Sequence, residues 1–293
     1  MLKNLLITIT AILIFGIIRL PLQQHLIEEE TKAQLLTEQM NLNADEMLEQ
    51  QLSVISLGGL RPLIAAILSM DAFDCFMRSD WHQLEKRYNQ ITALAPHSNF
   101  YWDNGSWHLA YNAASAMLDN TNLTPMERHE GFKKYIQTGR KFLIDGIRYN
   151  PTNWFLYNKL GDLYSDTYRL PDFQKAAQAY HQACKLGASY RVARKEFYSL
   201  ARVPSKAAEA YELGKKLYAV KAYRTPSMIN ILFALENRLN LPESQRIPFH
   251  ELYPTAEEAR EMLSAHLQNT LHYPIDGVRK KLDSLPRPAT QQP

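Results

Sequence analysis

The stretch YNKLGDLYSDTYRLPDFQKAAQAYHQA, residues 157–183, decides the expected fold. Its apolar residues recur at three- and four-residue steps in two runs separated by a proline-containing turn, which indicates two helices. Small residues at Gly161 and Ala176 let antiparallel helices approach closely, while Tyr164 and Tyr180 fill the space between neighbours. Such a helical hairpin cannot bury both of its faces alone, so we expect similar hairpins beside it.

Helical patterns flank this hairpin on both sides. Upstream, residues 80–96 fit a second helix that ends at a proline, and a Trp-rich helix follows over 102–114. Downstream, residues 207–214 repeat the second-helix signature after a basic helix over 190–202. Further helices are expected over 60–76, 227–239 and 255–271. Because the body of the chain lacks alternating β-branched runs, we predict an all-α fold.

The spacing of two prolines indicates one insertion. Pro96 and Pro151 each follow the end of a predicted helix pair, but they lie farther apart than one repeat of about 34 residues. We expect the extra residues near 119–125. Thr124 and Pro125 in this stretch fit the cap and the first position of the next helix.

The spacing in 157–183 resembles the tetratricopeptide consensus W-x2-L-G-x2-Y…A-x3-F-x2-A. In addition, LGGLRPLIAAIL (57–68), FYWDNGSWHLAYNAA (100–114) and GIRYNPTNWFLYNKLGDLY (146–164) resemble a family of bacterial membrane-anchored tetratricopeptide-repeat (TPR) proteins of unassigned function. The resemblance covers most of residues 50–220. It implies a TPR-like α-solenoid, membrane anchoring and a bacterial source, and it carries no known activity or site.

The amino terminus predicts a membrane anchor. Residues 5–22, LLITITAILIFGIIRLPL, are just long enough as a helix to cross a bilayer core of about 30 Å. The run ends without an A-x-A-like step, which favours an uncleaved anchor over a cleaved signal peptide and leaves cleavage open. Lys3 precedes the run and an acidic segment follows it, so we expect the terminus in the cytoplasm and the body exported across the cytoplasmic membrane.

The remaining chain divides by its hydrophobic pattern. After the anchor (1–22), residues 23–56 show a helical pattern with a polar remainder and are predicted to form a stalk helix. Gly58 and Gly59 then break the pattern. We expect a TPR-like domain over 57–285 and a disordered tail over 286–293.

Composition and motifs point away from catalysis. A net charge of +3 over 293 residues is too mild for a dedicated nucleic-acid binder. Cys75 and Cys184 form no C-x-x-C pair, and no phosphate-binding, metalloprotease or serine-hydrolase motif occurs. We therefore expect no metal, no cofactor and no small-molecule substrate, and Cys75 and Cys184 are expected to be free thiols unless export allows a disulfide.

The predicted binding site is a groove lined by the first helix of each hairpin. The positions next to the packing residues are His108 and Asn112 in one helix and Asn158 and Asp162 in another. Asn side chains both donate and accept hydrogen bonds, so they suit the backbone of an extended peptide. The alternative is a polar groove wall without a ligand.

A basic run over 185–224 is a second candidate surface. Its members include Arg191, Arg194, Lys195, Arg202, Lys215 and Lys216. Such a run is usually a solvated helix face. As a binding patch, it would meet anionic lipid headgroups or an acidic partner.

Two functions from different classes remain open. The first is a non-catalytic scaffold or assembly factor that binds a protein or peptide, motivated by an anchor followed by repeats. The alternative is a hydrolase or carbohydrate-active enzyme that uses acids such as Asp71, Asp103 or Asp162. That reaction requires two carboxylates about 5 to 10 Å apart across a cleft.

Overall fold

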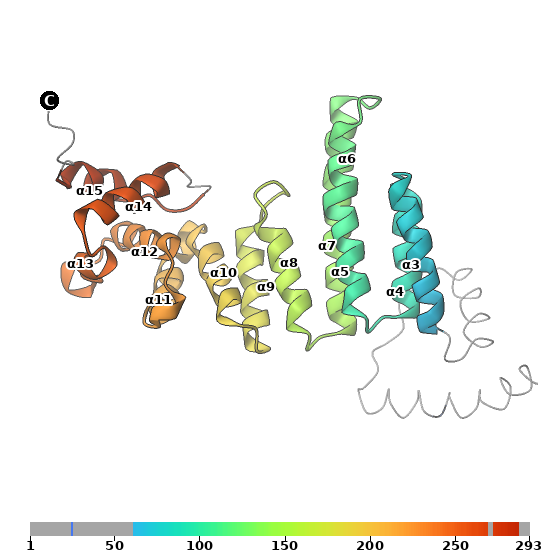
Figure 1. The fold of residues 1–293 in the computed structure, drawn as a ribbon, viewed down its shortest axis with the longest axis horizontal. Coiled ribbons are helices and arrows are strands. Elements are labelled where there is room, and N and C mark those ends of the chain that lie inside the picture. Colours follow the sequence, from blue (N-terminus) through green and yellow to red (C-terminus); the bar gives the residue numbers. More distant parts are fainter. Residues whose placement is uncertain (1–24, 26–60, 269–271, 287–293) are drawn as a thin grey trace, which may run out of the picture. The chain divides into compact units, whose positions relative to one another are not determined.

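The computed structural model describes His25, residues 61–268 and residues 272–286 (Figure 1). The regular secondary structure of these residues is all helical, without a β-strand, which confirms the all-α prediction for the described part of the chain. The predicted anchor (1–22), nearly all of the predicted stalk (23–56) and tail residues 287–293 lie outside the described residues. No helix within the described ranges is long and apolar enough to cross a membrane.

The chain divides into two compact units, Met1–Pro151 and Thr152–Pro293. The elements described in the first unit are α3 (Arg61–Met77), α4 (Trp81–Leu94), α5 (Asn99–Trp107), the π-helix η1 (His108–Ala113), α6 (Ala114–Asp119) and α7 (Pro125–Tyr149). They form two hairpins: α3 packs against α4, and the unbroken run α5–η1–α6 packs against α7 (Figure 1). The two hairpins meet because α4 also contacts α5 and η1.

Local signals explain where these helices begin and how they pack. The Thr124 hydroxyl accepts from the Glu127 amide and the Glu127 carboxylate accepts from the Thr124 amide, which is the reciprocal cap expected there, with Pro125 at the first position. At Gly139 in α7, a Cβ would lie 2.6 Å from Ala110 Cβ, so α7 approaches η1 too closely for any side chain. Only residues 120–124 separate α6 from α7. The extra residues between Pro96 and Pro151 therefore lengthen both helices of this hairpin.

The second unit continues with α8 (Trp154–Ser165), α9 (Phe173–Lys185), α10 (Tyr190–Ala201), α11 (Ala207–Tyr218), α12 (Pro226–Arg238), α13 (Phe249–Leu252), α14 (Ala256–Gln268) and α15 (Val278–Ser284). Short 3-10 turns, η2 (Pro204–Lys206), η3 (Lys221–Tyr223) and η4 (Glu243–Gln245), lie between the later helices. From α8 to α12 each helix packs against the next one in the chain (Figure 1). The predicted helices over 190–202, 227–239 and 255–271 correspond to α10, α12 and α14.

The close contact predicted at Gly161 is present. A Cβ on Gly161 would lie 2.5 Å from Cε1 of Tyr180, so the Tyr180 ring of α9 lies directly against the α8 backbone. Tyr180 and Ala176 are buried. The α8–α9 hairpin therefore packs through the small and aromatic residues that its sequence places between the helices.

Candidate interaction site

A polar cluster joins α8 to α10 within the second unit. Lys195 Nζ, on α10, donates to Asp162 Oδ1 at 2.7 Å and to Asn158 Oδ1 at 3.1 Å, both on α8. From α9, the Tyr180 hydroxyl donates to the same Asp162 oxygen at 2.8 Å. The Ser165 hydroxyl lies 2.9 Å from the Tyr180 oxygen. Three successive helices thus hold the Asp162 carboxylate in one orientation.

The cluster keeps hydrogen-bonding capacity at the surface. The Lys195 and Asp162 side chains are 41% and 35% exposed, whereas Asn158 is buried. An ammonium group has three donors, and two of those of Lys195 have acceptors among the described residues. From the described part of the chain, Asp162 Oδ2 receives one long contact of 3.4 Å, from Asn158 Nδ2. A spare donor and a spare acceptor therefore lie side by side, as the amide groups of a peptide backbone require.

The other predicted groove pair lies in the first unit. Asn112 Nδ2 is 3.2 Å from His108 Nδ1, both in the π-helix η1. The His108 ring is buried, with its centroid 4.7 Å from that of Phe76 and 5.7 Å from that of Tyr88. Burial lowers the pKa of His108, so the ring is held neutral. His108 is therefore a packing residue in the first unit.

The basic residues of the predicted patch differ in their surroundings. Arg202 is half-buried, with its guanidinium carbon 3.9 Å from the Tyr273 ring centroid and 4.8 Å from that of Phe173, and burial lowers its pKa. Lys215 pairs with Glu212 at 2.8 Å. Arg194 lies over the Tyr190 ring. Lys195 belongs to the polar cluster. Of the predicted patch, Arg191 and Lys216 are exposed and form no ion pair with a described residue.

The acids considered for hydrolysis lie on different helices, and two of them form ion pairs. Asp71 forms an ion pair with Arg87 of α4, and Asp162 is held by Lys195. Asp103 lies in α5, in the other unit from Asp162. Among the described residues, no group of three or more His, Cys, Asp or Glu side chains has the geometry to hold a metal ion.

One cluster was not predicted from the sequence. His181 Nδ1 of α9 lies 2.8 Å from Glu196 Oε1 of α10, and the same carboxylate is hydrogen bonded to the Cys184 thiol. Burial and the neighbouring Glu196 raise the pKa of Cys184 to about 11, so the thiol stays protonated at neutral pH. A thiol in this state is a poor nucleophile, and the cluster links α9 to α10. Cys75 and Cys184 are both free.

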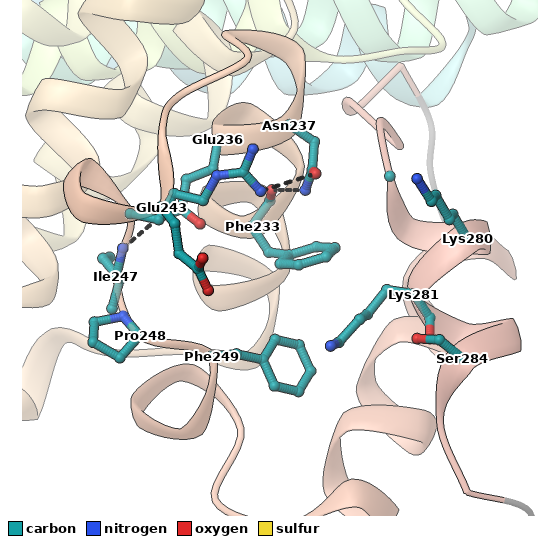
Figure 2. Close-up of a pocket in the computed structure, with 12 residues that line it drawn as sticks. Phe233, Glu236, Asn237, Glu243, Ile247, Pro248, Phe249, Lys280, Lys281 and Ser284 are labelled. Carbon is teal, nitrogen blue, oxygen red and sulfur yellow. Dashed lines mark hydrogen bonds between the residues drawn. The ribbon is translucent and has the colours of Figure 1, made fainter.

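A pocket of about 530 Å³ lies between α12, the segment leading into α13, and α15 (Figure 2). The aromatic part of its wall is formed by Phe233 and Phe249, and Lys281 Nζ lies 3.9 Å from the Phe249 ring centroid. Its charged residues are Glu236, Glu243, Arg246, Lys280 and Lys281. None of the site residues predicted above lines this pocket.

The most buried acid of this pocket is part of the packing. The Glu236 carboxylate, on a residue only 2% exposed, accepts from the Tyr211 hydroxyl at 2.9 Å and from the Ile247 amide at 2.8 Å. Burial raises the pKa of Glu236, and these hydrogen bonds act in the opposite direction. Glu236 therefore links α12 to α11 and to the segment before α13.

The chain matches no protein-family model and has no significant match among curated proteins.

Proposed function

We propose that this chain is a non-catalytic scaffold or assembly factor, in which a TPR-like helical array binds a peptide segment of a partner protein. Residues 1–22 anchor it in the cytoplasmic membrane, and the array lies on the exported side. This proposal goes beyond the all-α fold in two points. The helices are TPR-like repeats, and these repeats form a groove.

Contacts between alternate helices support the repeat character. In a helical array the first helices of successive hairpins lie side by side. Lys195 joins α8 to α10, and the Tyr198 hydroxyl of α10 lies 2.7 Å from Oγ1 of Thr225, which caps α12. In the first unit, Asn150 Nδ2 donates to the Pro96 carbonyl at 2.9 Å, which joins the ends of the second helices α4 and α7.

The observation that carries the binding function is the cluster of Asn158, Asp162 and Lys195. It lies on the first helices α8 and α10, is partly exposed, and presents a donor on Lys195 beside an acceptor on Asp162, whose carboxylate is held by the Tyr180 hydroxyl. An extended peptide offers a carbonyl to the Lys195 ammonium and an amide to Asp162 Oδ2. Because the groups are already oriented, little side-chain entropy is lost when the peptide binds.

Affinity capture of the full chain from detergent extracts tests this function. We expect specific proteins to copurify with the parent chain and to be lost from an Asn158→Ala/Asp162→Ala variant. A Gln182→Ala variant, changed at an exposed position of α9, is the matched control and keeps these proteins. Equal recovery by all three chains, or recovery of no protein above background, contradicts a binding role for the cluster.

The anchor and its orientation are tested separately. We expect the full chain to fractionate with the cytoplasmic membrane and to resist extraction at high salt, and a reporter that is active only outside the cytoplasm should be active when fused after residue 286. Reporter activity found only with a cytoplasmic fusion partner would reverse the proposed orientation.

A further inference from the structure

Helix α3 exposes an apolar face along its whole length. The residues on this face, each between 56% and 71% exposed, are Leu63, Ile67, Met70, Phe73 and Met77. Steps of three and four residues place them on one side of a helix with 3.6 residues per turn. The opposite side, with Ala65, Ala72 and Cys75, is buried and packs toward α4. A helix that is apolar on both sides is normally covered on both.

This face is unusual for the molecule. Of the exposed large apolar residues in the described ranges, no helix other than α3 carries more than two. Single exposed apolar residues are ordinary, but a continuous row marks a contact surface.

We propose that residues 36–55 of the same chain cover this face by running back along α3. This segment ends shortly before Arg61, the first residue of α3. The intervening residues, 56–60, are as short as usual connections between antiparallel helices, which take about 2 to 8 residues, and they include Gly58 and Gly59. The helical pattern of residues 36–55, predicted above to form a stalk, has its own apolar side, and that side requires a partner.

The apolar residues of the two segments correspond in position. Counted outward from the turn, the pairs at nearly equal distances along the chain are Leu52 with Leu63, Leu48 with Ile67, Met47 with Met70, and Met40 with Met77. One oppositely charged pair fits this register, because Glu38 falls at the level of the exposed Arg78. A covalently tethered partner is also present at an effective concentration of about millimolar, which favours this segment over a second copy.

Cysteine pairs in the full chain test the contact. Leu48→Cys with Ile67→Cys places two thiols at corresponding positions, and Leu42→Cys with Ile67→Cys is the control, since Leu42 falls on a different side of the same helical pattern. Each variant is oxidised as an equal mixture of isotopically light and heavy chains, and peptide mapping identifies the linked cysteines. Cys75 and Cys184 stay in place, because mapping distinguishes them.

The expected result is loss of both introduced thiols to a disulfide within one chain for the first pair, with little loss for the control. Disulfides that join light to heavy chains would show that a second copy covers α3 and would overturn the proposal. So would equal linkage of both pairs, or absence of linkage in a chain whose helix content matches the parent, which is the result expected if a membrane surface or another protein covers this face.

Discussion

Lys195 Nζ lies 2.7 Å from Asp162 Oδ1 and thereby joins two helices that are separated in the chain by α9. Both side chains are more than one third exposed, so solvent screens the ion pair. A double-mutant cycle of Lys195→Met and Asp162→Asn should give a coupling energy of about 1 kcal/mol or less. Denaturant unfolding of the four chains measures it. A coupling of several kcal/mol would assign the pair to stability and not to binding.

At Gly161 we expect substitution to be costly. Its Cβ position meets the Tyr180 ring, and the hydrogen bond from the Tyr180 hydroxyl to Asp162 keeps this ring from turning away. Gly161→Leu should lower the free energy of unfolding by about 1 to 3 kcal/mol through overpacking, and Gly161→Ala should also destabilise. The matched control is Gly131→Ala, where the Cβ would meet the flexible end of Met117. Because Ala is the better helix former by about 1 kcal/mol, this control should melt no lower than the parent. Unchanged melting of Gly161→Leu would contradict the close helix contact.

Stability should depend on the Glu236 carboxyl in a defined direction. Because the folded-state pKa is raised, the folded chain holds this proton more tightly than the unfolded chain. Its contribution therefore falls as pH rises from the ordinary value of 4.5 through the raised pKa. Glu236→Gln keeps an acceptor for Tyr211 and Ile247 and should be as stable as the parent at low pH and more stable at neutral pH. A constant difference in melting temperature across this pH range would show that ionisation of Glu236 does not matter.

The buried ring of His108 should act with the opposite pH dependence. Its folded-state pKa is lowered from 6.5, so the unfolded chain takes up a proton first as the medium is acidified. The contribution of His108 to the free energy of unfolding is therefore fully present above about pH 6.5 and declines as the pH falls below that value. His108→Gln, which keeps an acceptor for Asn112, should flatten this decline in thermal unfolding measured between neutral and mildly acidic pH. An identical decline in parent and variant would place the titration at other groups, such as His266, whose pKa burial also lowers.

Local sequence signals predicted the helices and the close contact within the α8–α9 hairpin, but not the polar contacts between other helices. Period and capping residues located α3 to α12 and the cap at Thr124, because these depend on neighbours within a turn or two. The short helices α13 and α15 carry too few residues for a periodic signal. The π-helix η1 was read as ordinary helix, since nothing in the residues around His108 distinguishes the two.

In the candidate site, too, the sequence predicted the features within one helix and missed the contacts between helices. Asn158 and Asp162 were both predicted as groove positions of one helix, and at a spacing of four positions their side chains come within reach of each other. Lys195 was assigned to a basic patch because composition reports charge without its partner, and the contact with Asp162 spans 33 residues. The Glu196 cluster was missed for the same reason, since His181 and Cys184 meet a carboxylate from the next helix.

Site-specific photocrosslinking in intact cells tests the proposed binding function most directly. A photoreactive residue at Arg191, exposed one helical turn before Lys195, is compared with one at Gln182, exposed on α9, in the full-length chain. We predict that the probe at position 191 attaches to a defined partner protein, that the probe at 182 does not, and that Asp162→Ala abolishes the adduct. No protein adduct at 191, or the same adducts at both positions regardless of Asp162, would contradict a peptide-binding groove along α8 and α10.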